Sequence, residues 1–272
     1  MAEKIISPGV FTNEIDQTFL PSAVADIGAA LIGPTLKGPA GIPTVVTSFS
    51  DFQTKFGDVV KSGSNSFQYL TSHAAEEYLK SSNTLTVVRI LDGTFSPATA
   101  TITASLSGAG TSVSSSFTLE TFGDGTIMNN ASPTATTNNI LTNGSVHNIR
   151  YEISNVNNSK GTFTLLIRAG NDNIKRKQIL ETFTNINLDP NSNNFISKVI
   201  GDQKQNVRTD GSTKYLELSG SFPRKSNFVR VKSVLRPTID YLDENGNVRV
   251  AAASQSLPAA GSGSGNGGFT GG

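Results

Sequence analysis

The pattern of hydrophobic and polar positions divides the chain into four zones. In the first, residues 1–20, a proline-glycine turn precedes a segment at residues 10–15 in which apolar and polar side chains alternate. This pattern predicts a strand with one apolar face. Pro21 follows and ends regular pairing, because proline has no backbone N–H. Two interpretations stay open: an edge strand of the local sheet, or an arm that joins a neighbouring subunit's sheet.

The second zone, residues 21–92, has the pattern of a parallel or mixed sheet covered by helices. Its first strand consists of small and apolar residues, which is typical of a strand buried on both faces. The strands are expected at residues 23–32, 44–46 and 85–91, and the helices at residues 49–56 and 66–80.

Each helix of this zone has its own signals. Ser48 is a candidate N-cap and Gly57 a candidate C-cap for the shorter helix, in which three phenylalanines follow at i, i+3 and i+7. Glu76 and Lys80 are spaced to form an i,i+4 pair in the longer helix. The apolar stripe of the longer helix is expected at Phe67, Leu70, Ala74 and Tyr78.

The third zone, residues 93–235, is a series of short apolar runs separated by turn-forming residues. This spacing favours an antiparallel sandwich or barrel. The runs lie at residues 100–106, 114–121, 150–153, 163–168, 178–183, 195–200, 214–218 and 228–234. The expected fold is therefore α+β: an α/β core segment, then an inserted antiparallel β-sandwich or barrel domain, with an extended N-terminal arm.

The last zone, residues 236–272, contains one hairpin signal and one low-complexity run. Asn245-Gly246 lies between two apolar pairs, which predicts a two-residue hairpin turn. The glycine- and serine-rich run at residues 261–268 is expected to stay without order, because it has too little apolar surface to bury. The chain is expected to be truncated after this linker.

Composition narrows the possible chemistry. The 272 residues include no cysteine, no tryptophan and two histidines, and the formal net charge is +1. A disulfide scaffold, a thiolate zinc site and thiol catalysis are therefore excluded, and no strong field attracts nucleic acid. The N-terminus has no apolar signal-peptide segment, and no run reaches the length of a membrane span.

Two glycine- or aspartate-containing motifs have better explanations as turns. Gly33, Gly38 and Gly41 suggest a phosphate-binding loop, but Pro39 removes an N–H where backbone donors would cradle the phosphate. The segment that begins at Asp243 matches the start of a calcium loop but lacks its sixth-position glycine and its final glutamate. Neither motif is expected to bind a ligand.

The remaining candidates are no stronger. His73 has no second metal-ligating side chain at helical spacing, and His147 lies in a turn-rich stretch. The basic run at residues 175–177 is interpreted as a solvated hairpin tip or as a contact with an acidic protein surface. The sequence therefore predicts neither an enzyme nor a cofactor.

Five segments, taken in order, carry a family resemblance. They are residues 6–16 (ISPGVFTNEID), 30–40 (ALIGPTLKGPA), 47–57 (TSFSDFQTKFG), 87–90 (VVRI) and 182–195 (TFTNINLDPNSNNF). Together they resemble the N-terminal portion of the contractile tail sheath proteins of myophages, most nearly the T-even-like branch. The matching core positions are Gly33, Pro34, Lys37, Gly38, Pro39, Phe49, Phe52, Phe56, Gly57 and Arg89.

The resemblance implies a structural role in the virion. Sheath subunits stack as hexameric rings into a helical sheath around the tail tube, and they contract to drive the tube through the host envelope. The implied partners are copies of the chain, the tail tube protein, and the baseplate and tail terminator proteins, without nucleic acid or membrane insertion. Assembly would take place in the host bacterial cytoplasm. The implied inter-subunit arm consists of Pro8, Gly9, Val10, Phe11, Thr12, Asn13, Glu14 and Ile15.

The resemblance also assigns roles to the zones. Residues 1–20 would be the arm, residues 21–92 the first part of the core, residues 93–235 a protruding domain and residues 236–272 a hairpin and linker. The chain departs from the family in length, because sheath proteins of this branch are considerably longer. The alternative function is a β-rich phage adhesin or tail-fibre module, which the 7% aromatic content supports poorly.

Overall fold

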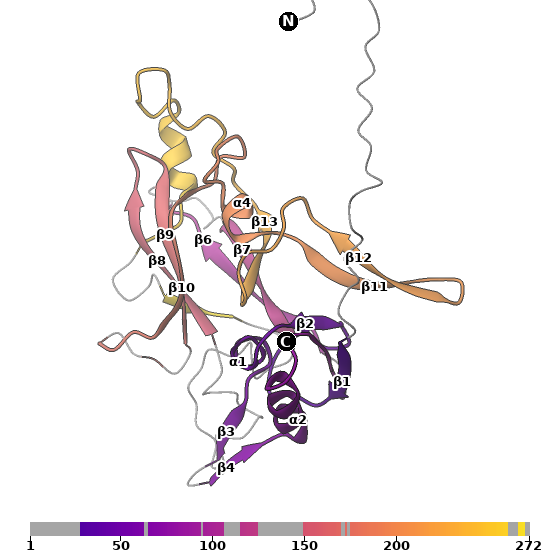
Figure 1. Cartoon of the computed structure of the whole chain (residues 1–272). Helices are drawn as coiled ribbons and strands as arrows, with labels where there is room; N and C mark the ends of the chain where they lie inside the picture. The colour runs from indigo at the N-terminus through magenta and orange to yellow at the C-terminus, as the bar shows by residue number, and fades with distance from the viewer. Residues whose placement is uncertain are drawn as a thin grey trace, which may run out of the picture.

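The computed structural model describes residues 28–62, 65–93, 95–105, 115–124, 149–169, 172, 175–260 and 266–269. Within them the chain forms a small lobe, residues 28–93, and a larger β-sandwich, from which a two-stranded hairpin projects (Figure 1). The fold is α+β, as predicted. The eight expected arm positions lie outside the described residues.

The small lobe is built on a mixed sheet of three strands. Its strand order is β1-β5-β2, with β1 parallel to β5 and β2 antiparallel to it. Helices α1 and α2 pack on one face, over a core that includes Phe52, Phe56 and Val87. The elements are β1 (Ala29–Gly33), β2 (Thr44–Val46), α1 (Phe49–Phe56), β3 (Val59–Ser62), β4 (Asn65–Gln68), α2 (Leu70–Leu79) and β5 (Leu85–Arg89).

Helix α1 has the predicted ends and the predicted buried side. The Ser48 hydroxyl accepts the Asp51 N–H at 3.1 Å, which satisfies one of the free donors at the helix start. Gly57 ends the helix with a φ of 73°, a backbone conformation that favours glycine. Phe52 and Phe56 are fully buried, and their ring centroids lie 5.5 Å apart. The caps and the phenylalanine spacing therefore fix this helix locally.

Two expectations for the small lobe are wrong. Helix α2 begins at Leu70, because β4 takes up the residues before it, and Leu70 is 82% exposed. Of the predicted stripe, Tyr78 packs against the core, but the small residues Thr71, Ser72 and Ala75 form the buried side and let the helix approach the sheet closely. Strand β1 is also not buried on both faces, since Ile32 is 64% exposed. The helices cover only one side of this sheet.

The sandwich consists of two antiparallel sheets, in the orders β13-β7-β6 and β10-β9-β8-β14. Apolar side chains from both sheets form one core, in which the rings of Phe117 and Phe163 stack at 5.6 Å between them. The strands are β6 (Pro97–Thr103), β7 (Ser115–Asp124), β8 (Ile149–Asn157), β9 (Thr162–Ala169), β10 (Ile179–Asn187), β13 (Val229–Val234) and β14 (Asn266–Gly268). The antiparallel pattern expected for this region is confirmed.

One strand prediction in this region is wrong and one strand was missed. The run at residues 195–200 forms a helix, α4 (Ile196–Ile200), because its two isoleucines at i,i+4 both reach the core. Strand β11 (Lys204–Asp210) is polar and has no alternating apolar signal. It pairs with β12 (Thr213–Ser219) in the hairpin that projects from the molecule (Figure 1).

The C-terminal zone is more ordered than its composition predicts. The Asn245-Gly246 turn closes only an isolated bridge between Leu242 and Val248, and a short 3-10 helix, η1 (Ala251–Ser256), follows. Strand β14 then pairs with β8, so the expectation of a wholly unordered run is wrong. Its Gly267 lies so close to the Tyr151 ring that a side chain there would overlap it. The glycine thus permits a close approach of the backbone to the ring.

In the described part of the chain, no helix combines the length and the apolar character needed to cross a membrane.

Replacing Phe269 with alanine tests the contribution of the C-terminal strand. Phe269 is 3% exposed and its ring meets Tyr151 edge-on at 6.2 Å. Phe269→Ala should lower the free energy of unfolding by about 3 kcal/mol, because it leaves a cavity in the core. Phe95→Ala is the matched control, since Phe95 is 39% exposed and should cost less than about 1 kcal/mol. Equal denaturant midpoints for both variants would contradict this placement of β14.

Candidate functional site at the junction of the lobes

The core positions of the family resemblance gather where the small lobe meets the sandwich. Residues 34–43, called the junction loop below, leave β1, pass the end of α1 and return to β2. The loop contains Lys37, Gly38 and Pro39, and Arg89 lies beside it at the end of β5. Phe49, Phe52 and Phe56 lie instead in the core of the lobe, behind the loop. The structure therefore brings most of the predicted positions together.

Arg89 holds the junction loop from inside. Its side chain is 3% exposed. The Nη1 group donates to the Gly38 carbonyl at 2.8 Å and to the Asp124 carbonyl at 2.7 Å, while Nε donates to the Thr35 carbonyl at 3.3 Å. Burial lowers the pKa of Arg89, and the charge of Asp124 opposes that shift. One buried cation thus links the loop to the end of β7.

Asp124 completes the link from the sandwich side. Its carboxylate Oδ2 accepts the Ala40 N–H at 2.9 Å, and its own N–H donates to the Gly38 carbonyl at 3.1 Å. Burial raises the pKa of Asp124, against the Ala40 hydrogen bond and the Arg89 charge, which lower it. The sequence offered no signal for this role, because Asp124 lies in a glycine-flanked segment that resembled a simple turn.

Two glycines let the loop pass the end of α1. Gly38 has a φ of 107°, and a side chain there would meet the Phe56 ring and the Lys55 carbonyl at less than 3 Å. At Gly57 a side chain would overlap Leu36. The Lys37 N–H donates to the Phe56 carbonyl at 3.0 Å, which ties the loop to the helix end. Gly38 therefore occupies a turn in the chain, as predicted.

Lys37 is a cation in an unusually apolar place. Its Nζ lies 5.3 Å from the centroid of the Phe228 ring, which belongs to the sandwich. No carboxylate among the described residues forms an ion pair with it. Burial lowers the pKa of Lys37 to about 8. The cation–π contact compensates only part of the cost of burying the charge.

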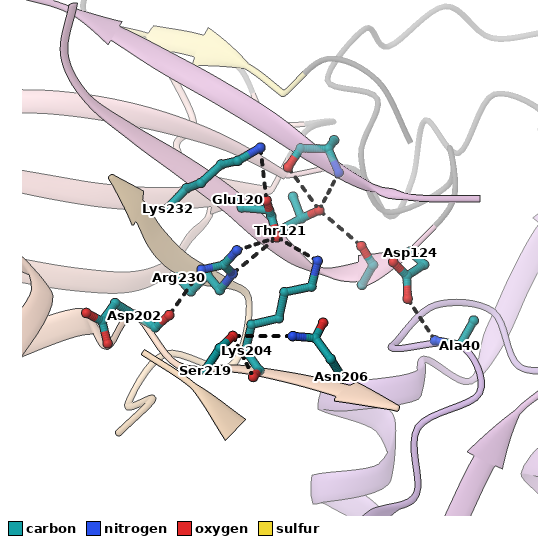
Figure 2. Close-up of polar contacts among 12 residues, drawn as sticks. Ala40, Glu120, Thr121, Asp124, Asp202, Lys204, Asn206, Ser219, Arg230 and Lys232 are labelled. Carbon is teal, nitrogen blue, oxygen red and sulfur yellow. Dashed lines mark hydrogen bonds and ion pairs between the residues drawn. The ribbon is translucent and has the colours of Figure 1, made fainter. Parts of the chain in front are cut away.

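A second charged cluster lies next to the junction, on the sandwich. The Glu120 carboxylate is almost fully buried, and Arg230, Lys204 and Lys232 converge on it (Figure 2). The nearest nitrogen–oxygen distances are 2.8 Å to Arg230, 3.3 Å to Lys232 and 3.5 Å to Lys204. Burial would raise the pKa of Glu120, but the hydrogen bonds and charges of these cations lower it overall. This cluster could not be predicted from the sequence, since its members come from three separate strands.

The other charged candidates lie away from the junction. His73 is exposed on α2. Lys177, in the basic run between β9 and β10, binds Glu152 at 2.6 Å, and Glu152 also binds the buried Arg168 at 2.8 Å. The Asp243 carboxylate caps its own turn by accepting two backbone N–H groups. Among the described residues, no group of three or more histidine, aspartate or glutamate side chains is placed to hold a metal ion.

The junction is suited to mechanical coupling. Its polar atoms are engaged with one another across the two lobes, through hydrogen bonds between the buried Arg89 and Asp124 side chains and backbone groups. Satisfied networks of this kind rigidify the elements that they connect. The arrangement can therefore transmit force between the small lobe and the sandwich without a large change in their relative position.

Comparisons with known proteins give only distant similarities. No family model matches the chain, and no curated protein matches it. Among solved structures, a sheath tail protein from Listeria innocua is 13% identical, with a TM-score of 0.34 over 76% of this chain and 34% of that one. A sheath tail protein from Desulfitobacterium hafniense is 14% identical, with a TM-score of 0.29 over 82% of this chain and 38% of that one. The chain thus spans little more than a third of each protein, and these TM-scores do not establish a shared fold.

The burial of Lys37 predicts a specific dependence of stability on pH. Below pH 8 the lysine is protonated in both the folded and the unfolded protein, so its contribution is constant. Between pH 8 and 10.5 the unfolded chain binds more protons, because its lysine pKa is 10.5 and the folded value is about 8. Folding stability should therefore rise with pH in this window, by about 3 kcal/mol at most.

Lys37→Met isolates this contribution. The variant keeps the aliphatic stem and removes the charge, so it should be more stable than the wild type at pH 7, with an advantage that shrinks as pH rises to 10. The measurement is the free energy of unfolding in denaturant at each pH. Lys214→Met, at an exposed position on β12, is the control for a general lysine effect. A constant difference across the whole pH range would contradict a buried, uncompensated Lys37.

Proposed function

We propose that this protein is a structural subunit of a contractile phage tail sheath, located in the virion. In this role it polymerises with copies of itself as hexameric rings around the tail tube. Contraction of the sheath then drives the tube through the host envelope. The subunit would also meet baseplate and tail terminator proteins at the two ends of the sheath.

The observation that carries this proposal is the open face of the small-lobe sheet. Ile32, Val45 and Ile90 are 64%, 52% and 56% exposed, and alternation along the strands places them opposite the helices. Sheets with parallel pairs are normally covered on both faces. A layer supplied by another polypeptide segment would complete this sheet. Self-association of subunits is the proposed source of that layer.

The edges of the same sheet support the proposal. Strand β5 is central, and no other described strand pairs with the outer edge of β1 or of β2. Unpaired edges accept further strands through backbone hydrogen bonds. The alternating residues 10–15 have the pattern for such a strand. Addition of the arm to a neighbour's sheet is therefore the proposed tether between subunits.

The projecting hairpin offers another contact surface. In its register Val207 lies opposite Leu216, and Leu218 follows on the same face. These three side chains are 48%, 43% and 59% exposed. An apolar hairpin face in solvent is typical of a protein that works through contact with other chains.

The rigid junction fits a protein whose subunits move as bodies. In rigid-body transitions the interfaces repack while each subunit keeps its internal contacts. The Arg89 and Asp124 links would preserve the geometry between the small lobe and the sandwich during contraction. The energy would come from a metastable arrangement of subunits, and no nucleotide would be hydrolysed by this chain.

Assembly of purified protein tests the proposal. The wild type should form ordered rings or tubes in negative-stain images, with sedimentation that depends on concentration. The double variant Ile32→Lys, Val45→Lys should remain folded, because both positions are exposed, but should sediment as a monomer. Deletion of residues 1–20 should likewise abolish tube growth.

The matched control is Ile239→Lys, an exposed isoleucine outside the small lobe that should assemble normally. If the double variant assembled to the same extent as the wild type, the exposed face of the small-lobe sheet would have no role in self-association. A wild type that stays monodisperse and binds glycans would favour the adhesin alternative instead.

A further inference from the structure

A pocket of about 140 Å³ opens beside the junction, between the junction loop, the end of β7 and the base of the β11–β12 hairpin. One part of its wall is apolar and includes Pro39, Ile42 and Leu218. Another part is charged and includes Lys204, Arg224 and Arg230. A pocket of this volume has room for several water molecules and therefore for a small ligand.

Positive charge exceeds negative charge around this pocket. Two carboxylates line it, those of Glu120 and Asp124, and a third, that of Glu181, lies close enough to act on Arg224 by its charge. Five cations lie in or next to its wall and make the contacts described above or stack on a ring: Arg89, Lys204, Arg224, Arg230 and Lys232. Partly desolvated sites with such an excess attract anions.

Arg224 is the cation whose donors are not used. Its guanidinium carbon lies 3.3 Å from the centroid of the Phe122 ring, so the side chain is held by stacking. It makes no hydrogen bond or ion pair with any residue in the described part of the chain. Burial lowers the pKa of Arg224 to about 10, against the charge of Glu181, which raises it, so Arg224 is charged at neutral pH. A guanidinium fixed in this way is ready to bind a carboxylate in bidentate fashion.

Arg230 and Lys204 are less available. Arg230 donates to Glu120 through Nε and Nη2 and to the Asp202 carbonyl through Nη1. Lys204 has a longer, 3.5 Å approach to Glu120 and is 37% exposed, so its ammonium can also serve an incoming anion. The two side chains would assist Arg224 in different ways: Arg230 by fixed charge, Lys204 by direct contact.

We propose that this pocket binds a carboxylate carried on a short aliphatic stem, with Arg224 as its main ligand. The stem would lie against the apolar wall and the carboxylate against the cations. This chemistry belongs both to free short-chain acids and to a glutamate side chain of another protein chain. The proposal does not depend on sheath assembly.

Titration of the protein with propionate, the isolated form of a glutamate side chain, tests the proposal. The Nε–H signal of Arg224 in a nitrogen-15 NMR spectrum should shift and saturate, with a dissociation constant of about 1 mM. Propionamide has the same shape without the charge and should cause no shift. Equal shifts with both compounds, or a shift that never saturates, would overturn the proposal.

Variants provide a second line of evidence. Arg224→Gln should weaken propionate binding at least about tenfold, and Lys204→Gln should weaken it less. The matched control is Arg208→Gln, because Arg208 is exposed on the same hairpin and pairs with Glu217; it should bind normally. A folded Arg224→Gln variant with unchanged affinity would overturn the proposal. If that variant does not fold, the contrast of propionate with propionamide in the wild type decides.

Two peptides distinguish the sources of the carboxylate. Ac-Ala-Glu-Ala-NH2 should shift the Arg224 signal and Ac-Ala-Gln-Ala-NH2 should not, if the ligand is a protein side chain. Binding of propionate without binding of the glutamate peptide assigns the site to a free acid. Binding of neither overturns the proposal.

Discussion

The buried guanidinium of Arg89 is the interaction on which the arrangement of this molecule depends. A charge that is 3% exposed is tolerated only when its donors are satisfied, and here the acceptors are carbonyl oxygens of the junction loop and of β7. The loop must therefore follow a path that presents those oxygens. Gly38, with its positive φ, makes that path possible past the end of α1. The position of the sandwich relative to the small lobe follows from the same set of contacts.

The junction therefore differs from the other surfaces of the molecule. The junction engages the polar groups where the lobes meet, whereas the free face of the small-lobe sheet and the projecting hairpin retain exposed apolar side chains. A rigid body with apolar surfaces suits a protein whose work is done between chains. The proposed sheath function assigns those surfaces to neighbouring subunits, and the pocket beside Arg224 adds a polar contact of defined chemistry.

The parts that could be predicted from the sequence are those that local physics determines. Helix α1 is defined by local signals: its caps Ser48 and Gly57 and its three phenylalanines. The turn at Gly38 is also predicted locally, by the glycine itself. The side of α2 that faces the sheet could not be predicted, because it consists of small residues that fit closely against the sheet. Strand β14 was not predicted, because its glycines are typical of a linker. Gly267 is needed there only because the Tyr151 ring, far away in the sequence, packs against it.

The candidate site divides in the same way. Lys37 and Arg89 were found through the resemblance, but their acceptors and neighbours belong to the sandwich, far along the chain. Glu120 looks like an ordinary strand residue and Asp124 like a turn residue until folding brings them to the junction. Pairings between distant segments have no local signature, so a single sequence cannot reveal them.

Native-state hydrogen exchange of the amides at the junction tests the central role of Arg89 most directly. In the wild type, the Ala40, Gly41 and Asp124 amides should be protected nearly as well as those of the sandwich core, because Ala40 and Asp124 donate across the junction and Gly41 donates to the Arg89 carbonyl. In Arg89→Met these three amides should lose protection together, while the Phe163 amide in the core keeps its protection. The control variant Arg249→Met, which alters an exposed arginine, should leave all of these amides protected as in the wild type. Fast exchange of the junction amides in the wild type, or unchanged protection in Arg89→Met, would contradict the account.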